Sequence, residues 1–259
     1  MLISLVIPVY NSNDILPELV NKITKNLTEK FEIILVNDFS KDNSWKTIKE
    51  ITETNHFVKG INLKENYGQH NAISAGLNYA NGKYIILMDD DLQHDPIYIN
   101  DIINELHKGY EACYVKYLYR KHVYWKRLVS KLNHLTSSIL AGKSTKIYTS
   151  SFKGFNRRIC NIINSDKNNE VFLDWIIINN SRKINSINIT HKERLSGKTN
   201  YNLKKLLILW SSMIMTIKSK NIYSIFIVSL LKFFIKYILY TLISKKKFNE
   251  KFIISDKTF

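Results

Sequence analysis

The sequence predicts an α/β fold in which a mostly parallel sheet is flanked by helices, followed by a C-terminal membrane-associated helical segment. Two observations predict the sheet: short apolar runs alternate with helical patterns over residues 2–108, and polar residues closely follow these runs. A third observation, the apolar and basic composition from residue 201 onward, predicts the membrane segment. We therefore expect a folded domain over residues 1–200 and an amphipathic, membrane-association segment over residues 201–259.

Strands and helices are predicted to alternate along the first part of the chain. The uninterrupted apolar run at residues 2–9 (LISLVIPV) predicts a buried strand, and the capping residues 11–14 then begin a helix. The same alternation predicts strands at residues 31–36, 56–63 and 84–88, and helices at residues 44–54, 69–80 and 96–108. Such units form parallel sheets, and ligands bind beyond the carboxyl ends of their strands.

The remaining elements are strands at residues 111–117, 150–156 and 183–190, and helices at residues 120–140, 157–164, 170–179, 203–218 and 222–243. The last helix has Lys232 and Lys236 as its only charges, and the three lysines 245–247 follow it. Because lysines are costly at the bilayer centre, a helix lying in the interface at the cytoplasmic face of the membrane fits this pattern best. A single spanning helix and a buried core helix are the alternatives.

Charge is distributed unevenly along the chain. The formal net charge of +16 divides into −5 over residues 1–108, +10 over residues 109–165, +2 over residues 166–200 and +9 over residues 201–259. This division argues against a uniformly basic coat for nucleic acid, so we expect no nucleic-acid partner, and a basic nucleic-acid-binding protein is the rival interpretation. The two cysteines, Cys113 and Cys160, cannot form a disulfide framework.

Polar groups that follow the predicted strands are expected to meet at one edge of the sheet. They are Tyr10-Asn11, Asn37-Asp38, Asn66–Gln69 and Asp89–Asp91. In an extended segment Asp89 and Asp91 point the same way, so they could share one hard divalent cation, Mg²⁺ or Mn²⁺. A solvated acidic turn is the alternative explanation of this triplet.

Four blocks carry a resemblance to a known family. They are VIPVYN (residues 6–11), EIILVNDFSKDNS (32–44), NYGQHNAISAGLNYANGKYIILMDDDLQHDP (66–96) and RLSGKTNYNLKKL (194–206). In this order they resemble the family 2 glycosyltransferases of the GT-A (Rossmann-like) fold, and especially the polyprenyl-phosphate and dolichyl-phosphate sugar transferases. The resemblance implies that residues 1–200 form the catalytic domain of an inverting enzyme that uses a nucleotide sugar.

The resemblance also implies roles for particular residues. Nucleotide-sugar binding falls to Pro8, Tyr10, Asn11, Asp38, Gly68, Gln69, Asp89 and Asp90. Metal binding falls to Asp89, Asp91 and Gln93, and contact with the acceptor phosphate to Arg194, Ser196, Lys198 and Tyr201. The catalytic residues would be Asp91 and, as a base, Asp174.

The acceptor implied by the resemblance is a polyprenyl phosphate or a lipid-linked glycan, in cell-envelope glycan synthesis. A glycan hydroxyl, in polysaccharide or lipooligosaccharide extension, is the alternative. The chain departs from the family pattern at Asn37 and Phe39, where Asp and Gly are usual, and at Asn200, where Lys is usual, with Lys198 two positions earlier. Base or sugar preference could therefore differ, and the oligomeric state, a homo-oligomer included, is left open.

Overall fold

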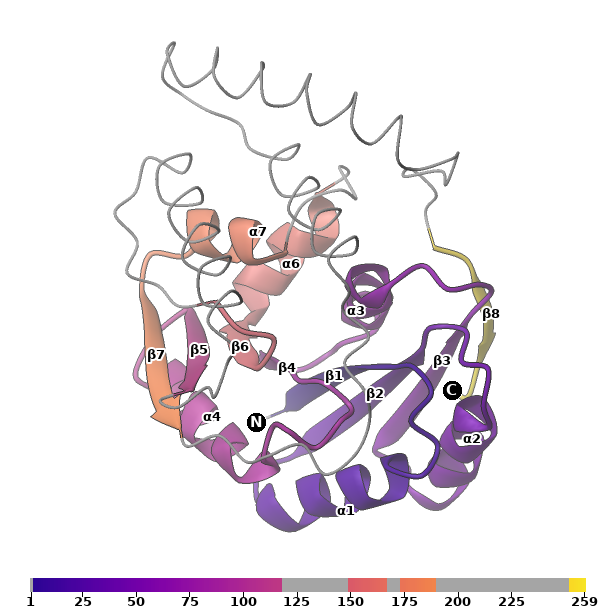
Figure 1. Ribbon diagram of the computed structural model, residues 1–259. Helices are drawn as coiled ribbons and strands as arrows, with labels where there is room; N and C mark the ends of the chain where they lie inside the picture. The colour runs from indigo at the N-terminus through magenta and orange to yellow at the C-terminus, as the bar shows by residue number, and fades with distance from the viewer. Residues whose placement is uncertain (1, 118–148, 167–172, 190–251) are drawn as a thin grey trace, which may run out of the picture.

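The computed structural model describes residues 2–117, 149–166, 173–189 and 252–259. One eight-stranded sheet lies at the centre of these residues, in the order β7-β5-β6-β4-β1-β2-β3-β8. Helices cover both of its faces (Figure 1). The predicted class, a mostly parallel sheet flanked by helices, is confirmed.

The first half of the sheet is parallel and buried. Its strands are β1 (Ile3–Val9), β2 (Phe31–Asn37), β3 (Val58–Leu63) and β4 (Tyr84–Leu87). The connecting helices are α1 (Leu16–Asn26), α2 (Ser44–Thr54) and α3 (Gln69–Leu77). Every residue of β1 is buried because helices cover both faces of the strand, and this burial explains its uninterrupted apolar sequence.

Helix α1 begins differently from the prediction. Its N-cap is Ile15, which makes no side-chain capping bond, and the polar residues 11–13 bind neighbouring loops instead. Ser12, for example, donates its hydroxyl to Asp90, which lies 78 positions away in the sequence. These polar groups therefore bind loops at the carboxyl ends of other strands and do not cap the helix.

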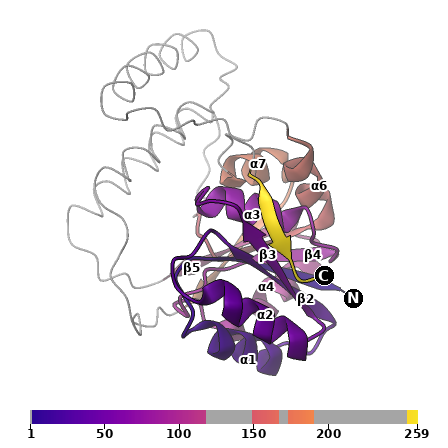
Figure 2. The ribbon, with the colours of Figure 1, turned by 90° about the vertical axis from the view of Figure 1, so that its right-hand side faces the viewer.

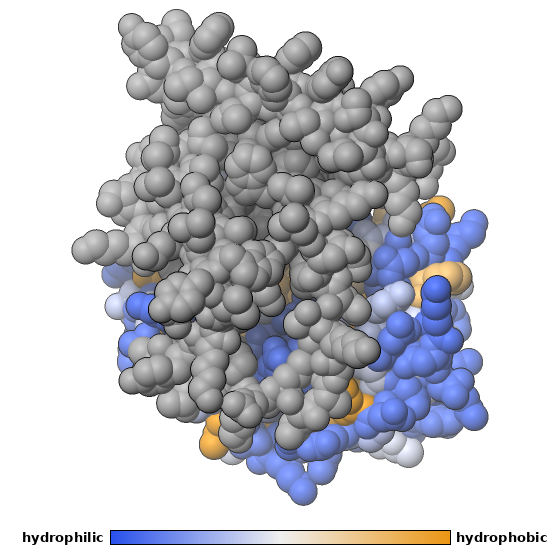
Figure 3. Space-filling model, in the orientation of Figure 1, coloured by the Kyte–Doolittle hydropathy of each residue, from blue (hydrophilic) through white to orange (hydrophobic). Residues whose placement is uncertain are grey.

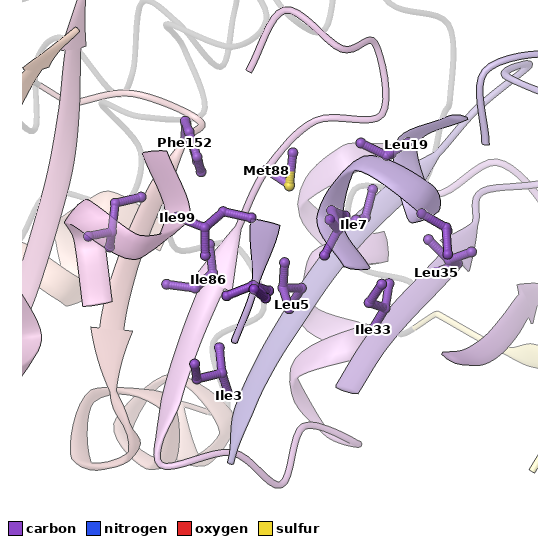
Figure 4. Packing of buried hydrophobic residues seen from close by; sticks show 14 of the residues in the cluster. Ile3, Leu5, Ile7, Leu19, Ile33, Leu35, Ile86, Met88, Ile99 and Phe152 are labelled. Atoms are coloured by element: carbon purple, nitrogen blue, oxygen red, sulfur yellow. The ribbon is translucent and has the colours of Figure 1, made fainter. Parts of the chain in front are cut away.

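Two apolar cores lie on opposite faces of the sheet. One packs α1, α2 and α4 (Ile99–His107) against the sheet, and Figure 4 shows its central side chains, among them Leu5, Ile7 and Ile86. The other packs α3, α6 (Arg157–Ser165) and α7 (Leu173–Asn180) against the opposite face. The side view in Figure 2 shows α1 and α2 on one side of the strands and α3 and α6 on the other.

The second half of the sheet is mixed. A short 3-10 helix, η1 (Pro96–Tyr98), leads into α4, and the strands that follow are β5 (Ala112–Tyr117), β6 (Lys153–Asn156) and β7 (Ile184–Ile189). Strand β6 lies between β4 and β5 and runs antiparallel to both, whereas β5 and β7 are parallel. This arrangement joins the later elements to the parallel half in one continuous sheet.

The sheet ends at β8 (Ile254–Lys257), which pairs antiparallel with β3. Thr258 extends the pairing, because its N–H donates to the carbonyl of Gly60 and its hydroxyl accepts from the Gly60 N–H at 2.8 Å. Residues 253–258 thus pair with the β3 segment, although we expected them in the membrane-association segment. The sequence ISDK carries no clear alternation, and its partner strand is almost 200 positions away.

The predicted helices at residues 120–140, 203–218 and 222–243 lie outside the described residues. Within the described ranges, no helix combines the length and the apolar composition needed to cross a bilayer.

Candidate functional site

Strands β1 and β4 stop pairing before β1 ends. Their register runs from Ile3 opposite Tyr84 to Val6 opposite Leu87, whereas the pairing of β1 with β2 continues to Val9 opposite Asn37. Strand β1 lies between β4 and β2, and the helices that follow β1 and precede β4, α1 and α3, cover opposite faces of the sheet. In α/β sheets ligands bind at such a switch point, beyond the carboxyl ends of the strands.

Pro8 lies in this last, one-sided part of β1. It is opposite Val36 of β2 and beyond the last residue that pairs with β4. A proline has no N–H to donate to a neighbouring strand, so it is tolerated where one neighbour has ended. Pro8 is buried and shapes the strand end that leads into Tyr10 and Asn11.

The acidic residues 89–91 follow β4 at this edge. The strand ends at Leu87 and residues 90–92 bend, so these side chains do not belong to the extended segment that the sequence argument assumed. Oδ1 of Asp89 accepts from Nε2 of Gln69, the first residue of α3, at 2.6 Å. Oδ1 of Asp91 accepts from the N–H of Gln93 at 3.1 Å.

Asp90 binds the loop that follows β1. Its Oδ2 accepts from the Tyr10 N–H at 3.1 Å and from the Ser12 hydroxyl at 2.5 Å. Burial, reinforced by the neighbouring charges of Asp89 and Asp91, raises the pKa of Asp90 to about 6 against the opposing effect of these hydrogen bonds. Asp90 therefore joins two strand ends, a role that its predicted part in nucleotide-sugar binding did not include.

His94 holds the backbone of the acidic turn, and the sequence assigned this residue no role. Its Nδ1 accepts from the Asp89 N–H at 3.2 Å, so this nitrogen carries no proton in that contact. The ring is buried and stacks on Phe152 with centroids 5.0 Å apart. Ser151 Oγ lies 3.4 Å from Nε2. These contacts hold the backbone of Asp89 in place.

Asp38 organises the loop before α3. Its carboxylate accepts from the N–H groups of Tyr67 at 2.8 Å and Gly68 at 2.9 Å, and its carbonyl accepts from Nδ2 of Asn66. Gly68 has a φ of 87°, a conformation that favours glycine, and it is the N-cap of α3. Asp38 thus fixes the point from which Gln69 reaches Asp89.

Asn11 and Asn37 make further contacts between the same loops. Oδ1 of Asn11 accepts from the Lys41 N–H at 2.8 Å, and its own N–H donates to the Ser40 hydroxyl at 3.0 Å. Asn37 is buried, and its Nδ2 donates to Oδ1 of Asn62 in β3. An amide suits this position because it both donates to Asn62 and accepts from Ser40.

Asp174 lies in a second polar cluster, on the face of the sheet covered by α7. Its Oδ1 forms an ion pair with Nζ of Lys153 and accepts from the Tyr114 hydroxyl at 2.9 Å. All three side chains are buried. Lys153 is opposite Leu87 in the β4–β6 register, two residues before Asp89, so the cluster lies beside the strand that carries the acidic turn.

The structure thus brings most of the predicted donor-site residues to one edge of the sheet. It connects Tyr10 and Ser12 to Asp90, Asn11 to the loop after β2, and Gln69 to Asp89. The residues predicted to contact the acceptor phosphate lie outside the described residues; they are Arg194, Ser196, Lys198 and Tyr201.

Residues 4–163 match the family model "Glycosyl transferase family 2". The chain belongs to this family. It is 32% identical over 210 residues to the undecaprenyl-phosphate 4-deoxy-4-formamido-L-arabinose transferase of Proteus mirabilis, which covers 79% of this chain and 64% of the relative. The Serratia proteamaculans protein of the same name is 32% identical over 216 residues, which covers 82% of this chain and 66% of that protein. The chain thus spans just under two thirds of the length of these relatives.

Two structures solved with bound nucleotide sugars have the same fold as this family 2 chain. Glucosyl-3-phosphoglycerate synthase of Mycobacterium tuberculosis, solved with Mn²⁺ and UDP-glucose, matches with a TM-score of 0.60 at 12% identity, over 85% of this chain and 80% of that chain. TarS 1–349 of S. aureus, solved with UDP-GlcNAc, matches with a TM-score of 0.55 at 15% identity, over 93% and 73% of the two chains. The expected GT-A fold is confirmed.

Proposed function

We propose that this family 2 chain transfers a sugar, with inversion, from a nucleotide-sugar donor to a polyprenyl phosphate at the cytoplasmic face of a membrane, in cell-envelope glycan synthesis. The observation that carries the proposal is the acidic turn at the β1–β4 switch point, in a chain 32% identical to an undecaprenyl-phosphate sugar transferase. Carboxylates, backbone N–H groups and a helix N-terminus at one strand edge suit a metal-bound diphosphate.

A divalent metal, Mg²⁺ or Mn²⁺, is part of the proposal. Within the described part of the chain, no three His, Cys, Asp or Glu side chains are grouped to hold a metal by themselves. Two carboxylates suffice where substrate phosphates and water complete the shell, so Asp89 and Asp91 would hold the metal with the donor, and Gln93 would lie beside it. When bound, the metal stabilises the negative charge of the departing nucleoside diphosphate.

The contacts of Asp174 favour a phosphate acceptor over a hydroxyl. A hydroxyl acceptor needs a general base, and Asp174 is the predicted one, but its carboxylate is buried and already binds Lys153 and Tyr114. A phosphate acceptor is already ionised and needs cationic partners, for which Arg194 and Lys198 are the predicted residues.

The test uses the full-length chain in membranes. We expect it, with Mn²⁺, to transfer labelled sugar from one of a panel of UDP-, GDP- and dTDP-sugars to undecaprenyl phosphate, giving an acid-labile lipid that carries a single sugar. Asp89→Asn should lose transfer, whereas Asp101→Asn, on the exposed side of α4, should retain it. Extension of an added glycan instead of lipid labelling would assign the hydroxyl acceptor. Full transfer by Asp89→Asn would refute the site.

A further inference from the structure

Backbone strain in this molecule is concentrated at the candidate site. Three non-glycine residues have positive φ in the described part of the chain: Asn11 at 55°, Phe39 at 56° and Leu92 at 56°. They follow β1, β2 and β4 respectively, three adjacent strands of the sheet. Side chains other than Asn and Asp rarely adopt this conformation, and such residues cluster at functional sites.

The three residues differ in what compensates for the strain. Asn11 is a residue type that tolerates positive φ, and its side chain binds the Lys41 N–H. Leu92 is only 9% exposed and packs into the core. Phe39 has neither compensation, because its bulky side chain is 51% exposed.

The contacts of its neighbours hold Phe39 in this conformation. On one side the Asp38 N–H donates to the Val9 carbonyl, and the Asp38 carbonyl accepts from Asn66. On the other side the Ser40 N–H donates to Oδ1 of Asn37. The loop therefore presents an aromatic side chain to solvent directly beside the buried Asp38.

We propose that Phe39 is a specificity-determining contact for the nucleobase of the donor. This inference rests on the proposed function and deepens it. Tyr10 directly follows β1 and is 37% exposed. The β1–β2 register ends with Val9 opposite Asn37, so Tyr10 and Asp38 are the next residues along the two adjacent strands. A nucleobase is the one part of a nucleotide sugar with a flat π-face that gains from an aromatic contact, whereas the diphosphate belongs near the acidic turn.

A docking surface for lipid or protein is the other interpretation of an exposed phenylalanine. On the face seen in Figure 3 the described surface is mostly hydrophilic, with separate small hydrophobic areas. The exposed large apolar side chains of the described residues are Tyr10, Phe39, Ile97, Ile253 and Phe259, and of these Tyr10 and Phe39 follow the strand ends β1 and β2. Two aromatic side chains beside a polar, acidic edge suit a small planar ligand better than an extended apolar partner.

The experiment compares nucleotides with a ligand that lacks a base. Binding of UDP, GDP and dTDP, each with Mn²⁺, is measured by calorimetry on the full chain, and Mn²⁺-pyrophosphate is the base-free probe. Phe39→Gly should weaken the preferred nucleoside diphosphate about 5- to 150-fold, the range of a lost base–aromatic contact, and leave pyrophosphate binding unchanged. It should also raise the Tm, because glycine adopts positive φ without strain.

Two further variants keep this test specific. Phe39→Tyr keeps an aromatic ring and should bind the nucleotide within about twofold of the wild type. Ile253→Ala removes an equally exposed apolar side chain beside β8 and should change nothing. Wild-type nucleotide affinity in Phe39→Gly would overturn this inference alone. The same holds if Phe39→Gly binds anionic lipid vesicles more weakly than the wild type but binds nucleotides equally well. A wild-type chain that binds none of the three nucleotides would overturn the proposed function as well.

Discussion

Replacing Lys153 with methionine removes the positive charge from the buried cluster beside β4. The Lys153 and Asp174 side chains are only 7% and 10% exposed, and Asp174 would keep only the Tyr114 hydroxyl of its two partners in the described residues. Breaking a buried pair from one side costs about 3–5 kcal/mol, because the remaining charge stays desolvated. For a chain of this size we expect the Tm to fall by roughly 6–20 °C.

The double variant Lys153→Met/Asp174→Leu leaves no unpaired charge. It should be more stable than Lys153→Met alone, and its main remaining cost, about 1–3 kcal/mol, is the hydroxyl of Tyr114 left without its partner. Urea denaturation of the wild type, both single variants and the double variant completes a double-mutant cycle. A loss below about 1 kcal/mol in Lys153→Met, or additive losses in the double variant, would refute the coupling of these side chains.

The variant Asp174→Asn tests whether Asp174 acts as a general base. Asp174→Asn still accepts a hydrogen bond from Tyr114, so much of the folded population should survive at low temperature. If Asp174 only positions Lys153, the turnover per folded molecule should remain within a few-fold of the wild type. A loss of about 10²–10⁴-fold in turnover at unchanged folded fraction would instead identify a general base.

Three other predictions concern stability. Gly76→Ala should cost about 1–3 kcal/mol in urea denaturation, because a Cβ atom would lie 3.0 Å from Cγ2 of Val36 and closer still to Val6, whereas an exposed α3 glycine would gain from the change. Burial opposes the charge of Glu32, but hydrogen bonds from Lys59, Ser4 and the Asn81 N–H outweigh it and lower its pKa below 4.5. The stability that Glu32 contributes is therefore present above that value and lost as pH falls through its folded pKa; Glu32→Gln should flatten this acid limb in a pH series of thermal melts. The pH dependence that Asp90 gives to stability has the opposite sign, because the pKa of Asp90 is raised to about 6. The stability that its carboxyl contributes is present at low pH and is lost as pH rises through 6. Asp90→Asn, measured without metal, should remove that decline, and an unchanged pH profile would contradict the assignment.

The parallel half of the fold could be predicted because its signals are local. The apolar run at residues 2–9 and the polar helix expected at residues 44–54 agree with β1 and α2 to within one residue at each end. The acidic turn was also predicted as a site, because three adjacent carboxylates at a strand end need a physical reason. These features depend on residues close together in the sequence.

The division of roles at the site was not predictable in the same way. Asp90 binds Tyr10 and Ser12 from the other side of the switch point, and Asp174 binds Lys153 and Tyr114 from two other strands. Periodicity does not encode such partners. The strand β8 was missed for the same reason, because its pairing with β3 depends on a contact between distant segments.

The return of the chain to β3 changes how residues 190–251 should be regarded. Strand β7 and strand β8 both belong to the sheet, so this stretch is an insertion anchored at each end and not a detachable tail. Truncation before residue 252 would leave the main-chain groups of β3 without the partner that now covers them, and exposed edges of this kind favour aggregation. A shorter version of the chain is therefore better made by removing residues from within 190–251 and keeping residues 252–259.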